Sequence, residues 1–189
     1  MNLFEFIKDN LFHVLPILIV GGFGLAIIIE RFRALYQAYP ISNPDDFFNT
    51  ITNFVMAGKL REATEHCDRY SSKPVARVVK TALLRAHLPE TVIEDGLQVA
   101  TSEASQTIQK RTGFLATIAN VATLLGLLGT IAGLIHSFEA VGHADAQQKA
   151  ALLSAGIATA MNATMMGLGV AIPCMLAFSL YTSRSNKMI

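Results

Sequence analysis

The chain is poor in charged residues. Asp, Glu, Lys and Arg make up only 15% of its 189 residues, whereas about a quarter is usual in a soluble domain. Hydrophobic residues make up 52%, and the mean hydropathy is +0.43. This composition predicts a membrane protein. The formal net charge of +1 gives no support for a nucleic-acid-binding surface.

The residues for several kinds of chemistry are also missing. Cys67 and Cys174 are too few and too far apart for a disulfide framework or a metal site. We expect Cys67 to lie in a helix in a reducing compartment and Cys174 to pack between membrane helices. The sequence has no phosphate-binding loop, metal-ligand cluster or nucleophile–base pair, so we expect neither an enzyme nor a bound cofactor. No cleavable signal peptide is predicted, because the first ten residues mix acid and base and no small-residue cleavage site follows the first apolar run.

Three long runs contain no Asp, Glu, Lys or Arg: residues 10–29, 112–138 and 150–183. Each reaches the roughly 20 residues with which a helix crosses a bilayer. The predicted fold class is therefore an all-α membrane protein with three transmembrane helices. Gly21, Gly22 and Gly24 suggest that the first run contacts a neighbouring helix closely, although a simple anchor is the favoured interpretation of that run.

The predicted domains follow from these runs. Residues 1–36 hold an amphipathic start (Leu3, Phe4 and Ile7) and the first transmembrane helix, and residues 37–111, which carry most of the charge, form a cytoplasmic helical region. The second transmembrane helix covers 112–138, a periplasmic loop 139–149, the third transmembrane helix 150–183 and a cytoplasmic tail 184–189. The second and third helices are expected to extend into the cytoplasmic region. The helix that begins after Pro89 is expected to continue into the second membrane segment without interruption.

Basic residues flank the three runs unevenly. One side of the three-helix layout carries Arg31, Arg33, Lys110, Arg111, Arg184 and Lys187. The other side carries only Lys8 and Lys149, and acidic residues accompany both. Because basic residues gather on the cytoplasmic side of a membrane, we expect a multi-pass membrane protein with the helical region 37–111 in the cytoplasm. Its N-terminus would be periplasmic and its C-terminus cytoplasmic.

The second and third runs contain polar residues that a simple anchor does not need. At about 100° per residue, one face of the second run collects four polar side chains: Asn120, Thr123, Thr130 and Ser137. The third run adds Thr159, Asn162 and Thr164. A single polar side chain in a membrane most often bonds another helix or its own i−4 carbonyl. Six such residues in two spans exceed that need, and they form a candidate ion pathway: Asn120, Thr123, Thr130, Thr159, Asn162 and Thr164.

Small residues follow the same two runs at helical spacing. In the third run, Gly156, Ala160, Ala163, Gly167, Ala171 and Cys174 form a stripe along which backbones can approach closely. The glycines expected to pack helices together are Gly126, Gly129, Gly133, Gly156 and Gly167.

Neither polar run contains a carboxylate, although a proton relay usually has an ionisable group inside the membrane. His13 and His136 lie near the outer ends of their spans, where a structural role is the favoured interpretation. If ions cross here, another chain must supply the charged ligand.

Three segments carry a resemblance to a known family. LLGLLGTIAGLIHSF (124–138) and GIATAMNATMMGLGVAIPCM (156–175) resemble the two signature blocks of the MotA/TolQ/ExbB proton-channel family, and IIIERFRAL (27–35) is similar to the end of its first helix. The resemblance covers essentially the whole chain and is closest to the ExbB/TolQ branch, which includes gliding-motor relatives. It implies a homopentamer in which the second and third spans line a pore, with Thr130 and Thr164 at the positions of the family's pore threonines.

The resemblance also implies a partner. Two copies of a one-span protein resembling ExbD, TolR or MotB would lie inside the pore, and the membrane Asp of that partner would be the protonatable group. The expected function is the channel-forming subunit of an ion-driven motor in the bacterial inner membrane that energises envelope transport, maintenance or motility. A non-conducting membrane scaffold is the alternative from another class, and the lack of intramembrane charge disfavours an independent channel. Lipid and other copies of the chain are the remaining expected partners.

One position departs from the family pattern. Thr159 stands where the ExbB/TolQ branch commonly has Glu, so the block here reads GIATAM. With Asn162 and Thr164 nearby, neutral oxygens could coordinate Na⁺, because hard cations favour oxygen ligands. Hydroxyls can also form a proton path. The expected coupling ion is H⁺, with a sodium-driven motor as the alternative.

Overall fold

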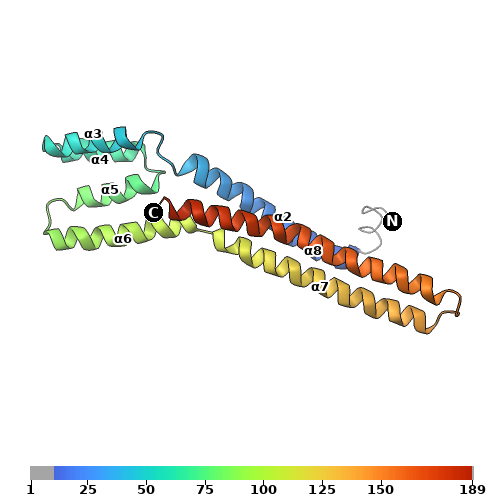
Figure 1. Ribbon diagram of the computed structural model, residues 1–189. Coiled ribbons are helices and arrows are strands. Elements are labelled where there is room, and N and C mark those ends of the chain that lie inside the picture. The colour runs from blue at the N-terminus through green and yellow to red at the C-terminus, as the bar shows by residue number, and fades with distance from the viewer. Residues whose placement is uncertain (1–10, 189) are drawn as a thin grey trace. The chain divides into compact units, whose positions relative to one another are not determined.

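The computed structural model describes residues 11–188, with side chains from residue 14 onward (Figure 1). The predicted amphipathic start (Leu3, Phe4 and Ile7) and the side chain of His13 lie outside this part. All regular structure between residues 11 and 188 is helical. Three helical stretches are long and apolar enough to cross a membrane: Val14–Ala38, Glu90–Gly142 and Lys149–Asn186. The predicted all-α fold with three candidate membrane-spanning helices is confirmed.

The helices group into two compact units. The membrane unit comprises residues up to Ile29 together with Arg111–Leu180, and the polar unit comprises Glu30–Lys110 together with residues from Tyr181 onward. Each unit has its own core, and each is described by itself below.

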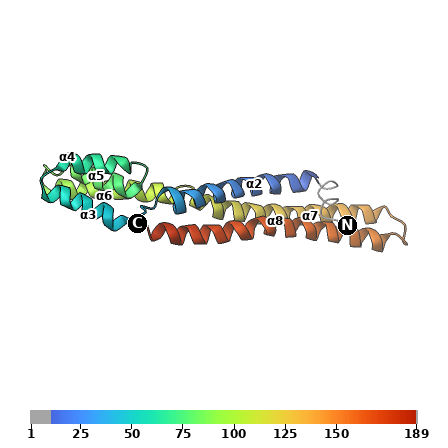
Figure 2. The same ribbon diagram turned by 90° about the horizontal axis from the view of Figure 1, so that it is seen from above.

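Close packing of α7 against α8 forms the centre of the membrane unit. Helix α7 (Thr112–Gly142) and helix α8 (Lys149–Asn186) run antiparallel and side by side (Figures 1 and 2). The buried residues on their facing sides are small and recur every three or four positions: Ala119, Ala122, Gly126 and Gly129 on α7, and Ala160, Ala163 and Gly167 on α8. A Cβ placed on Gly167 would lie 2.6 Å from the Ala122 carbonyl oxygen and 2.9 Å from the Gly126 Cα. The two backbones therefore touch where these glycines meet.

Helix α2 (Leu11–Arg33) packs its glycines against the other two helices of the membrane unit. A Cβ on Gly21 would lie 3.0 Å from a methyl carbon of Val170, and one on Gly24 would lie 2.8 Å from the Cys174 sulfur. A Cβ on Gly22 would meet no atom of another helix within 4 Å. Two of the three glycines that suggested a close helix contact thus make one. Cys174 belongs to the small-residue core of this unit, as the sequence predicts.

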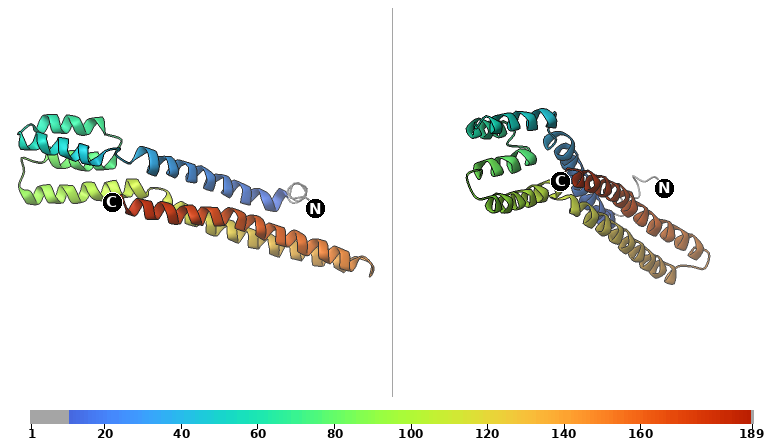
Figure 3. Two further views of the ribbon diagram at one scale, coloured as in Figure 1. Left: turned by 45° about the horizontal axis from the view of Figure 1, so that its top comes forward. Right: turned by 60° about the vertical axis from the view of Figure 1, so that its left-hand side comes forward.

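The polar unit contains four consecutive helices: α3 (Pro44–Met56), α4 (Leu60–Arg69), α5 (Pro74–Leu84) and α6 (Glu90–Gln109). Each packs on the next in this order, which can be followed in Figure 3. Pro44 and Pro74 open their helices, where the missing backbone donor costs least. Phe47, Ile51 and Cys67 lie in the core of this unit. Burial, assisted by the neighbouring charge of Asp68, raises the pKa of the Cys67 thiol.

A short π-helix, η1 (Ala34–Ala38), follows α2 and belongs to the polar unit. The side chain of Arg31, which is only 2% exposed, donates a hydrogen bond from Nη2 to the Ile108 carbonyl oxygen in the last turn of α6. An arginine is well suited to the negative end of a helix. This contact fixes the end of α2 on the end of α6.

The expectation of an unbroken helix from Pro89 into the membrane segment is wrong, because residues 110 and 111 interrupt the helix. Helix α6 ends at Gln109 and α7 begins at Thr112, and Arg111 between them has a left-handed backbone with φ of 61°. The Ile108 carbonyl, which would accept from residue 112 in a continuous helix, is capped by Arg31 instead. Residues 108–112 contain neither Gly nor Pro, so the sequence carried no signal for this break.

The helix contact at Gly167 leads to a first prediction. Gly167→Ala should lower the free energy of unfolding by about 1–3 kcal/mol, because the new methyl group overlaps backbone atoms that cannot rotate away. The measurement is thermal unfolding of the detergent-solubilised protein, followed by circular dichroism.

The matched control is Gly169→Ala on the same helix. A Cβ at Gly169 has no atom within 4 Å, and alanine favours a helix over glycine by up to about 1 kcal/mol. This variant should therefore be at least as stable as the wild type. Equal melting temperatures for the two variants would contradict the close α7–α8 contact.

Candidate functional site

Two threonine hydroxyls meet at the α7–α8 contact. Thr130 on α7 and Thr164 on α8 are hydrogen-bonded to each other through their Oγ1 atoms. Thr130 Oγ1 also lies 3.1 Å from the Gly126 carbonyl oxygen and 3.3 Å from that of Ala160, and Thr164 Oγ1 lies 3.3 Å from the Gly126 carbonyl oxygen. Each threonine thus reaches the i−4 carbonyl of the other. The result is a part-buried cluster of four neutral oxygens.

This hydroxyl pair has two possible proton orders. Each hydroxyl has one proton and can accept as well as donate. In one order Thr130 donates to Thr164, which donates to the Gly126 carbonyl. In the other order Thr164 donates to Thr130, which donates to the carbonyl of Gly126 or Ala160. The same oxygens can therefore relay a proton or coordinate a cation, and neither role needs a charged residue of this chain.

Glycines fix the helix spacing on both sides of the hydroxyl pair. A Cβ on Gly126 would lie 3.3 Å from the Thr164 Cα, and one on Gly129 would lie 2.8 Å from the Ala163 Cβ. Further along, a Cβ on Gly133 would lie 3.3 Å from the Ala160 Cα, and one on Gly156 would overlap the Ser137 side chain. With Gly167, these are the five glycines that the sequence assigned to helix packing. Their bare backbones let the two hydroxyls come within hydrogen-bond distance.

The other predicted pathway residues do not join the hydroxyl pair within one chain. Thr123 bonds its own i−4 carbonyl on Ala119 at 3.0 Å, and Thr159 bonds that of Ala155 at 3.0 Å. Asn120 is exposed and Asn162 is half-buried. A hydroxyl that is bonded to its own helix loses little by lying in lipid, so Thr123 and Thr159 need no partner within the chain. These side chains can therefore contact other chains.

The polar face predicted for α7 is therefore divided. Thr130 and Ser137 face α8, and Ser137 is only 5% exposed and donates to the Gly133 carbonyl at 2.7 Å. Asn120 and Thr123 lie on the exposed side. Sequence reasoning missed the backbone acceptors of Gly126 and Ala160. The available signal was their position, since each precedes one of the two threonines by four residues.

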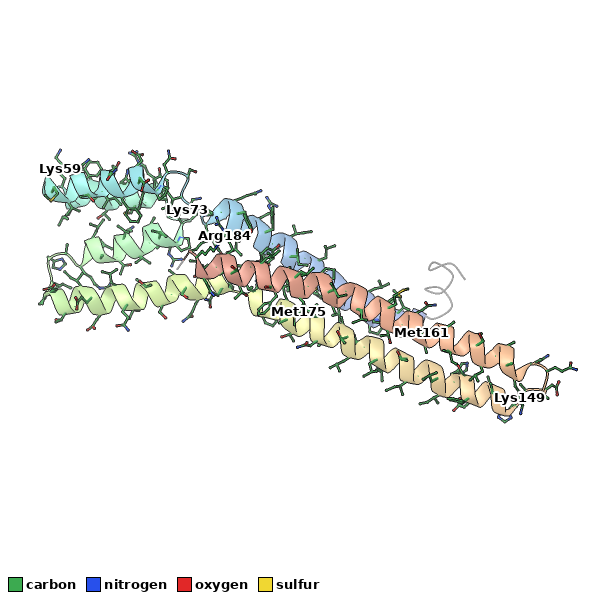
Figure 4. The ribbon with its side chains drawn as sticks, viewed as in Figure 1. Lys59, Lys73, Lys149, Met161, Met175 and Arg184 are labelled. Carbon is green, nitrogen blue, oxygen red and sulfur yellow. The ribbon has the colours of Figure 1, made fainter. Side chains whose placement is uncertain are left out.

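Large apolar side chains cover the exposed sides of the same helices. Leu124 on α7 is 63% exposed and Met161 on α8, marked in Figure 4, is 66% exposed. Other exposed apolar residues include Leu127, Leu128 and Ile131 on α7, and Met165, Ile172 and Met175 on α8. Apolar surfaces of this extent require lipid or other helices. Among residues 14–188, no three His, Cys, Asp or Glu side chains gather as a metal site would require.

Comparison with known proteins agrees with this geometry. The profile of the MotA/TolQ/ExbB proton channel family matches residues 70–189. The chain is 35% identical over 199 aligned positions to the Tol-Pal system protein TolQ of Haemophilus influenzae, a match that covers 97% of the chain and 85% of that protein. It is 31% identical over 183 positions to the biopolymer transport protein exbB1 of Vibrio cholerae, covering 96% of the chain and 70% of that protein.

A third relative is longer than this chain. The ExbB homologue of Methanothermobacter thermautotrophicus, which is named as a biopolymer transport protein, is 28% identical over 171 positions. The match covers 90% of the chain and 59% of that protein. The chain thus spans well under two thirds of this relative.

The hydroxyl pair leads to a second prediction. In a double-mutant cycle, Thr130→Val and Thr164→Val should be less than additive, because either change alone already removes their mutual bond. The coupling energy should be about 0.6 kcal/mol, the average for hydrogen bonds between membrane helices. It is measured as the free energy of unfolding in mixed micelles.

A cycle that pairs Thr130→Val with Thr159→Val serves as the control. Thr159 bonds only within α8, so the two effects should add. Strict additivity in the Thr130–Thr164 cycle would show that the two hydroxyls do not interact.

Proposed function

This chain belongs to the MotA/TolQ/ExbB proton channel family, in its ExbB/TolQ branch, and on that premise we propose that it is the channel-forming subunit of an ion-driven motor in the inner membrane. The Thr130–Thr164 pair carries the proposal. It sets two hydroxyls and two carbonyls inside a membrane helix pair whose spans hold no carboxylate. Such an oxygen cluster can serve ion movement only if another chain brings the charge.

The proposed charge donor is a one-span partner of the ExbD/TolR kind with an Asp in its membrane helix. TolQ of Haemophilus influenzae is a Tol-Pal system protein by name, and exbB1 of Vibrio cholerae is a biopolymer transport protein. By analogy, the process powered here is envelope maintenance or transport. The exposed apolar sides of α7 and α8 would contact neighbouring copies and such a partner, and we propose the assembly of five copies that the family resemblance implies.

The proposed orientation has the N-terminus and the α7–α8 loop in the periplasm and α3–α6 in the cytoplasm. The support is the excess of basic residues at one end of the spans, which marks the cytoplasmic side. In this orientation, Thr130 and Thr164 lie well inside the membrane spans, and the exposed Asn120 and Thr123 lie nearer the cytoplasmic end of α7.

The third prediction tests conduction. Thr130→Val should reduce proton flux about tenfold, which corresponds to about 1.4 kcal/mol in the barrier, because valine keeps the side-chain shape but removes the hydroxyl. Flux is measured with a pH-sensitive dye in proteoliposomes that contain the chain and its membrane-Asp partner. Native mass spectrometry shows whether the assembly is intact, and Thr130→Ser, which keeps the hydroxyl, should conduct normally.

A non-conducting scaffold is the second candidate, and one observation favours it. Both hydroxyls of the pair already have partners within the chain, as a purely structural helix contact would require. If the Thr130→Val complex conducts at the wild-type rate with its assembly intact, the pore role of Thr130 is wrong and the scaffold is favoured.

The fourth prediction concerns the coupling ion. Because each hydroxyl of the Thr130–Thr164 pair can both accept and donate a proton, we propose that the coupling ion is H⁺. Proton flux through the reconstituted complex should be the same in Na⁺-free and Na⁺-rich medium. A flux that requires Na⁺, together with ²²Na⁺ uptake, would identify a sodium-driven motor instead.

A further inference from the structure

The polar unit gathers two arginines and several tyrosines where the apolar runs of α2 and α8 end. Arg31 is almost fully buried and lies over the Tyr39 ring, 5.8 Å from its centroid. Arg184 on α8, marked in Figure 4, lies over the Tyr36 ring at 5.4 Å. Tyr181 is buried as well and interacts electrostatically with Tyr36 and Arg31. Ser185 is one helical turn after Tyr181 on the same face of α8, and it is buried too. We call these residues the arginine cluster.

The arginine cluster contains hydrogen-bond donors that lack acceptors. The Nε atoms of Arg31 and Arg184 and the Oγ of Ser185 are buried with no hydrogen-bond partner. Ser185 is fully buried. A buried donor without an acceptor costs about 1–3 kcal/mol, and a charged one costs more. Three such donors in one cluster indicate a missing acceptor group.

The position and charge of the cluster indicate what that group is. Arg184 is the first charged residue after the uncharged run 150–183, and Arg31 is the first basic residue after the run 10–29, directly after the exposed Glu30. Both therefore lie at the level of lipid headgroups. Arg33 and Lys187, both exposed, add positive charge nearby. A missing acceptor in this setting is an anion, and basic pockets at this membrane depth bind lipid headgroups.

Phosphate suits these donors better than other anions at a membrane surface. A guanidinium offers its donors in a plane, in a fork that matches two phosphate oxygens. A guanidinium held over a tyrosine ring keeps those donors free for an acceptor in its plane. A phosphate has enough oxygens left to accept from a neighbouring hydroxyl such as that of Ser185.

We propose that the arginine cluster binds the phosphate of an anionic phospholipid headgroup. Arg184, the less buried of the two arginines, makes the direct contact, and the Ser185 hydroxyl donates a second bond. Arg31 acts as a positioning residue, because it is tied to the Ile108 carbonyl and adds positive charge behind the site. Since the Arg184 Nε and the Ser185 Oγ are both covered in the lipid-free chain, the last turn of α8 must open locally for one phosphate to reach both. The proposal does not depend on ion conduction.

The fifth prediction compares Arg184→Gln with Lys187→Gln. Both variants remove one positive charge from the same end of α8, but only Arg184 lies over a tyrosine with a buried, unpartnered Nε. Native mass spectrometry of the full-length protein in detergent, titrated with phosphatidylglycerol or phosphatidylcholine, counts the lipids retained. Arg184→Gln should weaken phosphatidylglycerol binding about tenfold, the effect of losing one charge-assisted hydrogen bond. Lys187→Gln should stay within about twofold of the wild type, as expected for a surface charge.

A second variant keeps the test decisive if Arg184→Gln fails to fold. Ser185→Ala removes a hydroxyl that has no partner in the lipid-free chain, so the melting temperature without lipid should not fall. The rise in melting temperature that phosphatidylglycerol produces should become smaller.

Three results would overturn the proposal. Equal losses in Arg184→Gln and Lys187→Gln would mean that only the total charge matters. Equal retention of phosphatidylcholine and phosphatidylglycerol would exclude an anion-selective site. If inorganic phosphate raises the melting temperature of the wild type as much as phosphatidylglycerol does, and Arg184→Gln abolishes both effects, the site binds free phosphate and the lipid assignment is wrong.

Discussion

The contact between Gly126 and Gly167 is the constraint on which the membrane unit depends. At that point, the backbones of α7 and α8 approach so closely that a single methyl group on Gly167 would overlap the Ala122 carbonyl. Lipid chains are as apolar as leucine side chains, so membrane helices gain their association from close packing and interhelical hydrogen bonds. Small residues supply the packing here, and the hydrogen bonds follow from it. With larger residues at these positions, the Thr130 and Thr164 hydroxyls would be too far apart to bond.

The same constraint separates two functions of the polar residues. Thr130, Thr164 and Ser137 are turned toward the α7–α8 contact, whereas Asn120 and Thr123 are exposed. A helix that is polar on one side and small on another can pack within its own chain and still offer hydrogen-bonding groups outside. The exposed groups are already bonded to their own helix where they are threonines, which reduces the cost of holding them in lipid. This leaves them available without requiring a permanent partner.

Much of the fold could be predicted from the sequence, because charge-free runs and glycine spacing report directly on membrane helices and their contacts. The three candidate spans, the close helix contact of Gly24 and the packing of Cys174 between helices are of this kind. The break at Arg111 could not be predicted, since the group that takes the Ile108 carbonyl there is Arg31, which is distant in sequence. Helical periodicity placed Thr123 and Thr130 on one face of α7. That face is wide, and in the structure one part of it, with Thr130, contacts α8, whereas the part with Thr123 is exposed. Which of them meets α8 depends on the position at which the glycines interlock, and that is a property of the helix pair.

The lack of carboxylates in the spans has a physical rationale in the proposed assembly. A charged Asp at the centre of a membrane helix costs about 2.5–3.5 kcal/mol on insertion scales. If every copy of a five-walled pore carried one, that cost would recur in each wall and the like charges would repel one another across the pore. A wall that offers only hydroxyls and carbonyls avoids both costs. One carboxylate on a central partner could then meet equivalent oxygen clusters in turn, each of nearly equal energy. Motion of the partner relative to the walls requires such equality, because a single strongly charged wall would hold the partner in place.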